Sequence, residues 1–324
     1  MNTGRLTCAY KLTTEMFRCG SSRLLGFYGT NLQNSSESLM RCVVPAKDNI
    51  IVTGDQSGAE ALIVAMETRP GKFRKLFDLN IKVHSYMALQ LFTEKFANGH
   101  PVSRYKNVDP DTLKSYPECK ELLSAIKHST REYDLGKRVI HAKNYSMGPR
   151  TFQLNVLELS EGSVALSFKE SKEFLATHEQ TFPEILEWQG QVKGVLAATR
   201  TLRNLYGYPR HFGHLWNDEL ERQALAFIPQ STVAVITHKA FTELFWRIKR
   251  EKLPWTLLNQ KHDSITLECP EVHGEKACQY LKEHLGRELT SSRGEKFRMG
   301  VGLSIGKNFG HYDEKENPNG LKEL

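Results

Sequence analysis

A polar centre flanked by strand-forming residues constrains this chain more than any other stretch. Residues 257–267 read LLNQKHDSITL, which predicts two short strands meeting at a tight turn with Asp263 at its tip. Upstream, the apolar run Asn49–Thr53 leads through Gly54 into Asp55, which predicts another strand that ends in a carboxylate. A hairpin fixes a carboxylate better than a loose loop does. Two such aspartates could meet across one sheet and hold a divalent metal.

Short sequence motifs around these aspartates resemble motifs of the DNA polymerase I family (family A). DQSGAE at 55–60 is similar to the first catalytic motif, and HDS at 262–264 is similar to the third. Between them, GKRVIHAKNYSMG at 136–148 resembles the second motif. TEMFRCGSS at 14–22 and TNLQN at 30–34 resemble two short motifs that precede the first catalytic motif in the family. Several motifs in the family's order indicate the family far more specifically than any single motif does.

The resemblance implies an α+β fold. A polymerase palm, which is an antiparallel sheet with flanking helices, is expected over residues 1–60 and 223–324, and a mainly helical fingers subdomain over 61–222. Thumb and exonuclease domains have no counterpart in these words. We therefore expect a fragment, a truncated reading frame, or one half of a split polymerase whose partner chain bears the thumb or exonuclease.

The same resemblance implies a template-directed DNA polymerase of DNA replication, with phage-like motifs. Its substrates would be primer–template DNA and deoxynucleoside triphosphates. Two Mg²⁺ ions, held by Asp55 and Asp263, would assist phosphoryl transfer to the primer 3′-end. Lys137 is the third catalytic candidate, because its charge would meet the phosphates and its proton could pass to pyrophosphate.

The nucleotide-binding candidates centre on one expected helix. Lys137, His141 and Tyr145 recur at i, i+4 and i+8, so they share a helix face that offers an ammonium and two rings to a nucleotide. The resemblance adds Glu60, whose family counterpart blocks a ribose 2′-hydroxyl, and His84, for which a capping or structural role is a slightly favoured alternative. Arg131 is a further candidate, near the position of the family's arginine but out of phase with it.

Five positions depart from the family pattern, and one of them is Ala226, which stands where the family has an asparagine before the glutamine matched by Gln230. Tyr133 stands where the family has an arginine, His141 replaces an aromatic residue, and Ser146 replaces a glycine. Gln56 replaces the commoner aromatic residue of the first motif. The departures in the second motif weaken the match at the phosphate and the sugar.

Six residues are DNA-contact candidates by resemblance. Two would face the minor groove, where similar acceptors on every base pair allow shape to be checked without reading sequence. One is expected near the template base, two near the primer terminus, and one at a template phosphate, where an ordinary surface arginine is an equal alternative. In that order they are Arg18 and Gln33, Gln230, His262 and Gln260, and Arg210.

Composition sets looser bounds. The chain has 324 residues and a formal net charge of +7, which fits a polyanionic partner but also many other basic proteins. Its six cysteines form no close metal-ligand pair and suggest reduced thiols. No signal sequence or membrane-spanning run is seen, so we expect a cytoplasmic protein without membrane contact.

Coarse periodicity completes the expectations. Helices are predicted over 56–66, 83–92 and 274–285, and over 223–250 with Trp246 in the core. Residues 98–117 are predicted to be loop.

Two other functions compete with the polymerase. A single-subunit RNA polymerase shares the palm, but Glu60 argues against it. A catalytically silent nucleic-acid-binding remnant fits the second-motif departures and the missing thumb, whereas Asp55 and Asp263 oppose it.

Overall fold

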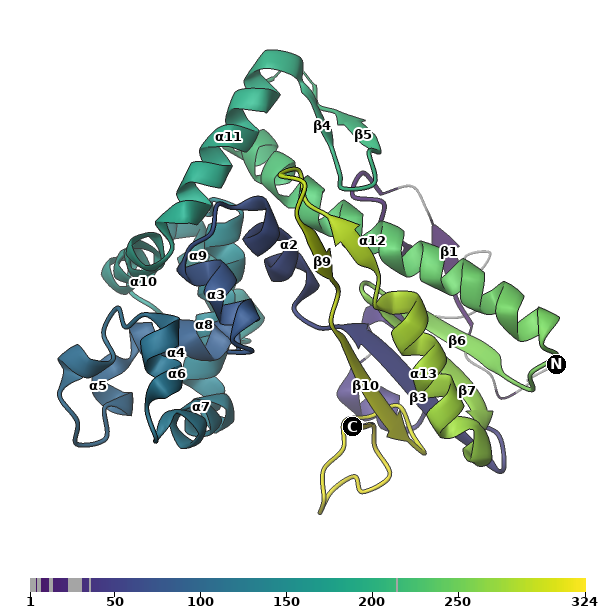
Figure 1. Cartoon of the computed structure of the whole chain (residues 1–324). Helices are drawn as coiled ribbons and strands as arrows, with labels where there is room; N and C mark the ends of the chain where they lie inside the picture. The colour runs from purple at the N-terminus through teal and green to yellow at the C-terminus, as the bar shows by residue number, and fades with distance from the viewer. Residues whose placement is uncertain (1–3, 5–6, 12–13, 23–30, 35, 214) are drawn as a thin grey trace. The chain divides into compact units, whose positions relative to one another are not determined.

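The chain is divided by its internal contacts into two units, which Figure 1 shows with their elements labelled. The computed structural model describes residues 4, 7–11, 14–22, 31–34, 36–213 and 215–324. Unit 1 comprises residues 1–60, 203–208 and 227–324, and unit 2 comprises 61–202 and 209–226. Thr30, in one of the family-like words, lies outside the described residues.

Unit 1 is built on a five-stranded sheet in the order β11-β10-β3-β7-β6, with antiparallel pairing between neighbours. The central strand β3 buries Ile50, Ile51 and Val52 in succession, so both of its faces are covered there, which is why its sequence is so apolar. The strands are β3 (Asn49–Gln56), β6 (Thr256–Lys261), β7 (Ser264–Pro270), β10 (Val301–Gly306) and β11 (Lys322–Glu323). The strand and the hairpin expected from the sequence are confirmed.

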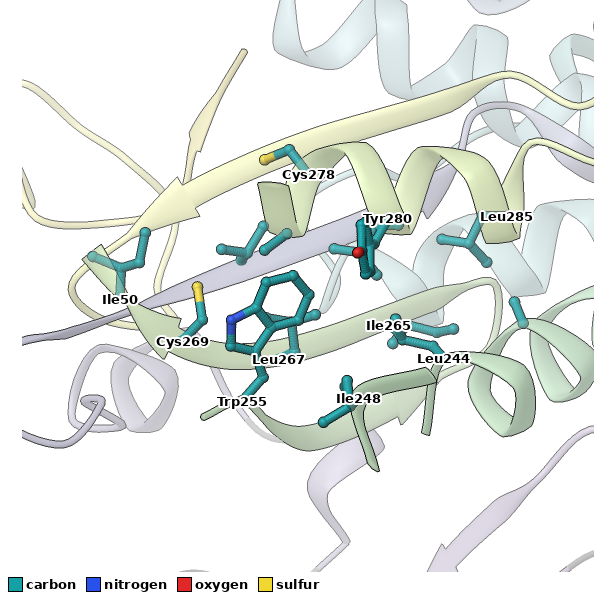
Figure 2. Close-up of a cluster of buried hydrophobic side chains, with 14 residues drawn as sticks. Ile50, Leu244, Ile248, Trp255, Ile265, Leu267, Cys269, Cys278, Tyr280 and Leu285 are labelled. Carbon is teal, nitrogen blue, oxygen red and sulfur yellow. The ribbon is translucent and has the colours of Figure 1, made fainter. Parts of the chain in front are cut away.

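Two helices contribute to the hydrophobic core that packs on this sheet: α12 (Asp218–Arg250), through its unit 1 portion, and α13 (Gly274–Leu285). Figure 2 shows their buried side chains against those of β3 and β7. The contact is close at Gly54, where a Cβ atom would lie 3.0 Å from Leu281 Cβ. Burying each large aliphatic side chain here contributes roughly 1.5–3 kcal/mol of hydrophobic free energy.

The expectation that Trp246 is buried is wrong, because 62% of the residue is exposed. The buried row of α12 runs through Ala240, Leu244 and Ile248 at intervals of four residues. Trp246 falls midway between two members of that row and so points to the opposite side of the helix, where its ring packs edge-on against Phe245 at 5.2 Å.

Small elements complete unit 1. They are β1 (Ala9–Lys11), β2 (Gly20–Ser22), η1 (Leu32–Asn34), α1 (Glu37–Arg41), η3 (Glu271–His273), β8 (Glu288–Thr290) and β9 (Lys296–Arg298). The strand β4 (Thr201–Arg203) ends where the chain enters unit 1, and β5 (Pro209–His211) begins where it leaves again.

Unit 2 is helical. Its helices are α2 (Ala59–Glu67, from Ala61), α3 (Lys72–Asp78), α4 (Val83–Leu91), α5 (Thr93–Phe96), η2 (Val102–Arg104), α6 (Pro110–Ser115), α7 (Cys119–His128), α8 (Thr130–Asn144), α9 (Pro149–Leu159), α10 (Phe168–Thr181) and α11 (Pro183–Thr199). The expected sheet with flanking helices and the mainly helical second part are therefore both present. Within the described residues, none of the helices has the length and apolarity needed to span a membrane.

One local expectation needs correction. The supposed loop at 98–117 contains α6, which begins at Pro110. The Asp109 side chain accepts a hydrogen bond from Asp111 N, and proline at the first helical position favours a helix start. The Gly- and Pro-rich composition concealed this short turn of helix.

Candidate active site

The hairpin between β6 and β7 turns through just two residues, His262 and Asp263. Lys261 and Ser264 are paired across it, so the turn closes the ladder tightly. His262 has a φ of 53°, in the left-handed region that costs energy for a residue with a Cβ atom. The ladder on both sides holds this conformation and fixes the position of Asp263.

Asp55 and Asp263 lie on neighbouring strands at the same end of the sheet. Asp55 pairs with Ser264 in the β3–β7 ladder, one residue beyond Asp263. The main-chain N–H of Gln56 donates to the Asp263 carbonyl at 3.2 Å. Asp55 is exposed and Asp263 is partly buried. The sheet thus brings together the two aspartates that the sequence singled out.

Burial raises the pKa of the Asp263 carboxyl, and the charge of Glu60 acts in the same direction, whereas His262 and Arg18 oppose it. Burial also lowers the pKa of His262, and the positive charge of Arg18 adds to this effect. A cation beside Asp263 would offset the cost of ionising it. The electrostatics of the turn therefore favour a bound positive charge.

The donor set fits Mg²⁺. This ion is commonly held by one or two carboxylates and completes its shell with water and substrate phosphates. In the part of the chain that the structure describes, no group of three or more His, Cys, Asp or Glu side chains gathers as a metal cage. Asp55 and Asp263 would supply the protein ligands, and the remaining ligands would come from solvent and substrate.

Glu60 joins two DNA-contact candidates. It lies in the first turn of α2, and its Oε1 forms an ion pair with the Arg18 guanidinium. The Gln230 side chain of α12 donates through Nε2 to Glu60 Oε2 at 3.3 Å. Three predicted residues from separate segments of unit 1 thus form one hydrogen-bonded group.

The other two glutamines of the candidate set are buried, each with 5% exposure. Gln33 Nε2 donates to the Gln260 carbonyl at 3.0 Å, and Ser21 N donates to Gln33 Oε1 at 3.1 Å. Gln33 therefore binds β6 to the N-terminal segment. Gln260 N in turn donates to the Tyr10 hydroxyl at 2.9 Å, and burial raises the pKa of Tyr10 to about 12.

In unit 2, Lys137 and His141 are both exposed on α8. The helix ends at Asn144, so Tyr145 is its C-cap and lies just past the last helical residue. Ser146 follows with a φ of 57°. Its N–H donates to Lys143 O, and Met147 N donates to Ala142 O at 2.8 Å, which together form a Schellman motif.

His84 packs behind these side chains. Its ring meets Tyr133 edge-on at 5.9 Å and stacks with His141 at 6.4 Å. Burial, with the nearby charges of His141 and Lys137, lowers the pKa of His84 to about 3. A neutral His84 adds no charge for a phosphate. Tyr133, which replaces the family's arginine, is thus a ring partner of His84.

Two arginines complete the predicted set. Arg131 is exposed and, six residues before Lys137, lies roughly 120° around the helix axis from it. It lines a hollow of about 330 Å³ together with Arg138. Arg210 donates to Gln223 Oε1 at 2.8 Å and lies over the Phe212 ring, 4.4 Å from its centre.

Sequence reasoning missed one pair at the site. Gln56 Nε2 donates to Thr237 Oγ1 of α12 at 2.7 Å and to the Asp263 carbonyl at 3.3 Å. The available signal was the phase of β3, since Gln56 is a polar residue in the row of Ile50, Val52 and Gly54 that faces the core. Nothing in the sequence pointed to Thr237.

A sequence profile of DNA polymerase family A matches residues 121–311, which is more than half of the chain. The chain belongs to DNA polymerase family A. This assignment agrees with the order of the motifs around Asp55, Lys137 and Asp263.

Relatives with assigned names support the same family. DNA polymerase I A, chloroplastic/mitochondrial, of Arabidopsis thaliana is 22% identical over 82% of this chain, and DNA polymerase I of Bacillus caldotenax is 24% identical over 80%. The alignments cover only 25% and 27% of those proteins. The chain therefore spans about a quarter of the length of these relatives.

A solved structure shares the fold. The POL domain of Pol1 from M. smegmatis, in complex with a DNA primer-template and dNTP, superimposes with a TM-score of 0.65 at 18% identity. The match covers 95% of this chain and 48% of that one. The sheet and helices described above thus have the fold of a family A polymerase domain.

Proposed function

We propose that this chain is the catalytic region of a template-directed DNA polymerase that extends a primer 3′-end with deoxynucleotides. The main support is the β3–β7 register, which sets Asp55 opposite Ser264 and therefore beside Asp263 in a family A chain. In this proposal unit 1 acts as the palm and unit 2 as the fingers, and the substrates are primer–template DNA and deoxynucleoside triphosphates.

The two aspartates would hold two Mg²⁺ ions. When bound, these ions supply charge that activates the primer 3′-oxygen and neutralises the leaving pyrophosphate. The role of this chain is to fix the carboxylates: Asp263 through the tight turn and Asp55 through its ladder pairing on either side. Such preorganised charge is usually the largest catalytic contribution.

The exposed face of α8 would bind the incoming nucleotide. The Lys137 ammonium would lie at the phosphates and pass a proton to pyrophosphate as it leaves. His141 and Tyr145 would meet the base and sugar, with the neutral His84 ring supporting His141 from behind. Arg131 would contribute charge from the side of the same helix.

Glu60 would exclude a ribose 2′-hydroxyl. Its bonds to Arg18 and Gln230 fix the carboxylate from both oxygens, which suits a steric role. Arg18, Gln33, Gln230, Gln260, His262 and Arg210 are the proposed DNA contacts. For Gln33 and Gln260, which are buried here, contact with DNA requires their present hydrogen bonds to open.

The test is extension of a labelled primer–template by the purified chain with Mg²⁺ and four deoxynucleotides. Asp263→Asn should reduce extension by at least about a hundredfold, because one fixed charge is lost from the metal site. Primer–template affinity should remain, since in this proposal the carboxylate binds metal and not the phosphate backbone. Normal extension by Asp263→Asn would refute the metal assignment. A wild-type chain that binds DNA but never extends it would favour a silent remnant or a polymerase half that needs a thumb-bearing partner chain.

A further inference from the structure

The hairpin turn that carries Asp263 is held from behind by a buried polar group. Gln56 follows Asp55 directly on β3, and it is fully buried, with 0% exposure. Its main-chain N–H and its side-chain Nε2 both donate to the same acceptor, the Asp263 carbonyl, at 3.2 and 3.3 Å. The main chain of the turn cannot rotate without loss of both hydrogen bonds.

Thr237 anchors the Gln56 side chain. Its Oγ1 accepts from Gln56 Nε2 at 2.7 Å and itself donates to the Val233 carbonyl at 3.0 Å within α12. Thr237 is also completely buried. A chain of hydrogen bonds therefore runs from the backbone of a long helix, through one hydroxyl and one amide, to the turn.

Stability alone does not account for a glutamine at this position. Gln56 Oε1 is buried and has no hydrogen-bond partner among the described residues. An unpaired buried acceptor lowers the stability of the folded state, and an apolar side chain in this row would avoid that cost. What the amide adds, and an apolar side chain does not, is the connection from α12 to the Asp263 carbonyl.

We infer that Gln56 and Thr237 are positioning residues that hold the Asp263 carboxylate in the orientation that binds metal. This inference rests on the proposed function, because it gives Asp263 that role. Both residues are completely buried and act indirectly: Gln56 acts on the turn, and Thr237 acts on Gln56.

The variants are Gln56→Leu, Thr237→Val and the double variant. Gln56→Leu removes the amide and its unpaired oxygen while keeping an apolar core position filled. Thr237→Val conserves shape and removes only the anchor. Thr232→Val is the matched control, because Thr232 is a fully buried threonine of the same helix with the same hydrogen bond to the carbonyl four residues earlier.

The first readout is independent of catalysis. Native-state hydrogen exchange at the Gln56 amide reports opening of its bond to the Asp263 carbonyl. Exchange there should accelerate about tenfold in Gln56→Leu and Thr237→Val, on the scale expected when a supporting hydrogen bond is lost. The neighbouring Ser57 amide, which donates to Gly300 O at 3.0 Å, should not change, and Thr232→Val should change neither site.

The second readout is kinetic. Both single variants should lower kcat by about 10- to 100-fold, since a misplacement of about 1 Å at a catalytic group has effects of that size. The Mg²⁺ concentration for half-maximal extension should rise, while affinity for primer–template should stay within about twofold of wild type. The double variant should match the single variants, because both act through one connection.

Unchanged exchange at residue 56 together with an unchanged Mg²⁺ dependence would overturn the inference. It would also be overturned if the fold-changes in kcat of the two single variants multiplied in the double variant. The failure of the proposed function has a different signature. In that case the wild-type chain does not extend a primer, yet exchange at residue 56 still decides whether Gln56 and Thr237 hold the turn.

Discussion

The turn at Asp263 and the exposed face of α8 fix their side chains by opposite means. In unit 1, Asp263 is held from its own backbone, with a strand on each side and a buried amide behind it. In unit 2, Lys137 and His141 stand exposed on α8, and their support comes from the other side of the helix, where Gly136 packs against α4.

The difference matches what each group would have to do. A metal ligand tolerates little displacement, so its placement is set residue by residue. A helix face that meets a nucleotide is placed as one rigid body, through the packing of the helix itself. Substitutions behind α8 should therefore matter more for stability than substitutions on its exposed face.

The sharpest way to break this comparison is Gly136→Ala. A Cβ atom there would lie 2.7 Å from His84 O and 2.9 Å from Ala88 N, and both atoms belong to the backbone of α4. We expect overpacking to lower the free energy of unfolding by about 1–3 kcal/mol after the gain of about 1 kcal/mol in helix propensity has been subtracted. Urea denaturation measures it.

Gly190→Ala is the matched control for that experiment. Gly190 lies within α11, and an added Cβ atom would meet nothing within 4 Å. It should stabilise the protein by about 0.5–1 kcal/mol. If Gly136→Ala stabilised the protein as well, the α4 contact would not determine where α8 sits within unit 2.

Unit 2 should lose stability at acid pH because of the buried His178. Burial, with the charge of Lys143, lowers its pKa from 6.5 to about 3. Below pH 6.5 the unfolded chain binds a proton that the folded chain does not, so stability falls as the pH drops toward 3, by up to about 1.4 kcal/mol per pH unit. His84, also lowered to about 3, acts in the same direction.

The substitution His178→Leu tests this pH dependence. The free energy of unfolding is measured by urea denaturation at pH 7 and at pH 5. Between these two conditions it should fall by about 2 kcal/mol less in the variant than in wild type. Equal losses in both proteins would show that His178 already binds its proton in the folded state at pH 5.

The smallest effect is expected at the end of α8. Ser146 occupies a left-handed position, with a φ of 57°, where glycine carries no steric cost. Ser146→Gly should therefore stabilise the protein by about 0.5–1 kcal/mol, whereas Ser146→Ala should be nearly neutral, because alanine has the same clash as serine. A thermal unfolding series on the three proteins measures the difference. If alanine stabilised the protein as much as glycine does, the left-handed φ of residue 146 would not be the cause of the stabilisation.

Periodicity and turn chemistry predicted the elements that carry the site. The apolar run of β3 and the polar interruption at His262 and Asp263 are local signals, and the structure confirms the strand and the hairpin. The helix over Gly274–Leu285 was predicted with the same bounds. These features depend on neighbours within a few residues, which is why the sequence discloses them.

Contacts between distant segments could not be predicted in the same way. Gln56 and Thr237 are 181 residues apart, and neither residue type alone signals the other. The expectation that Trp246 lies in the core is wrong, because the phase of α12 relative to the sheet decides its exposure. The raised pKa of Asp263 likewise depends on burial and on the nearness of Glu60, both of which arise only in the fold.

The central position of β3 has a consequence for the order in which the chain folds. Thr53 on β3 and Thr266 on β7 are 213 residues apart, and the β10 partner of β3 comes later still. Unit 2, made mainly of helices, lies entirely between them in the chain. Because local contacts form sooner than distant ones, the helices should assemble first while β3 waits for its partners. During synthesis, this apolar strand thus lacks both neighbouring strands until β7 and then β10 have been made.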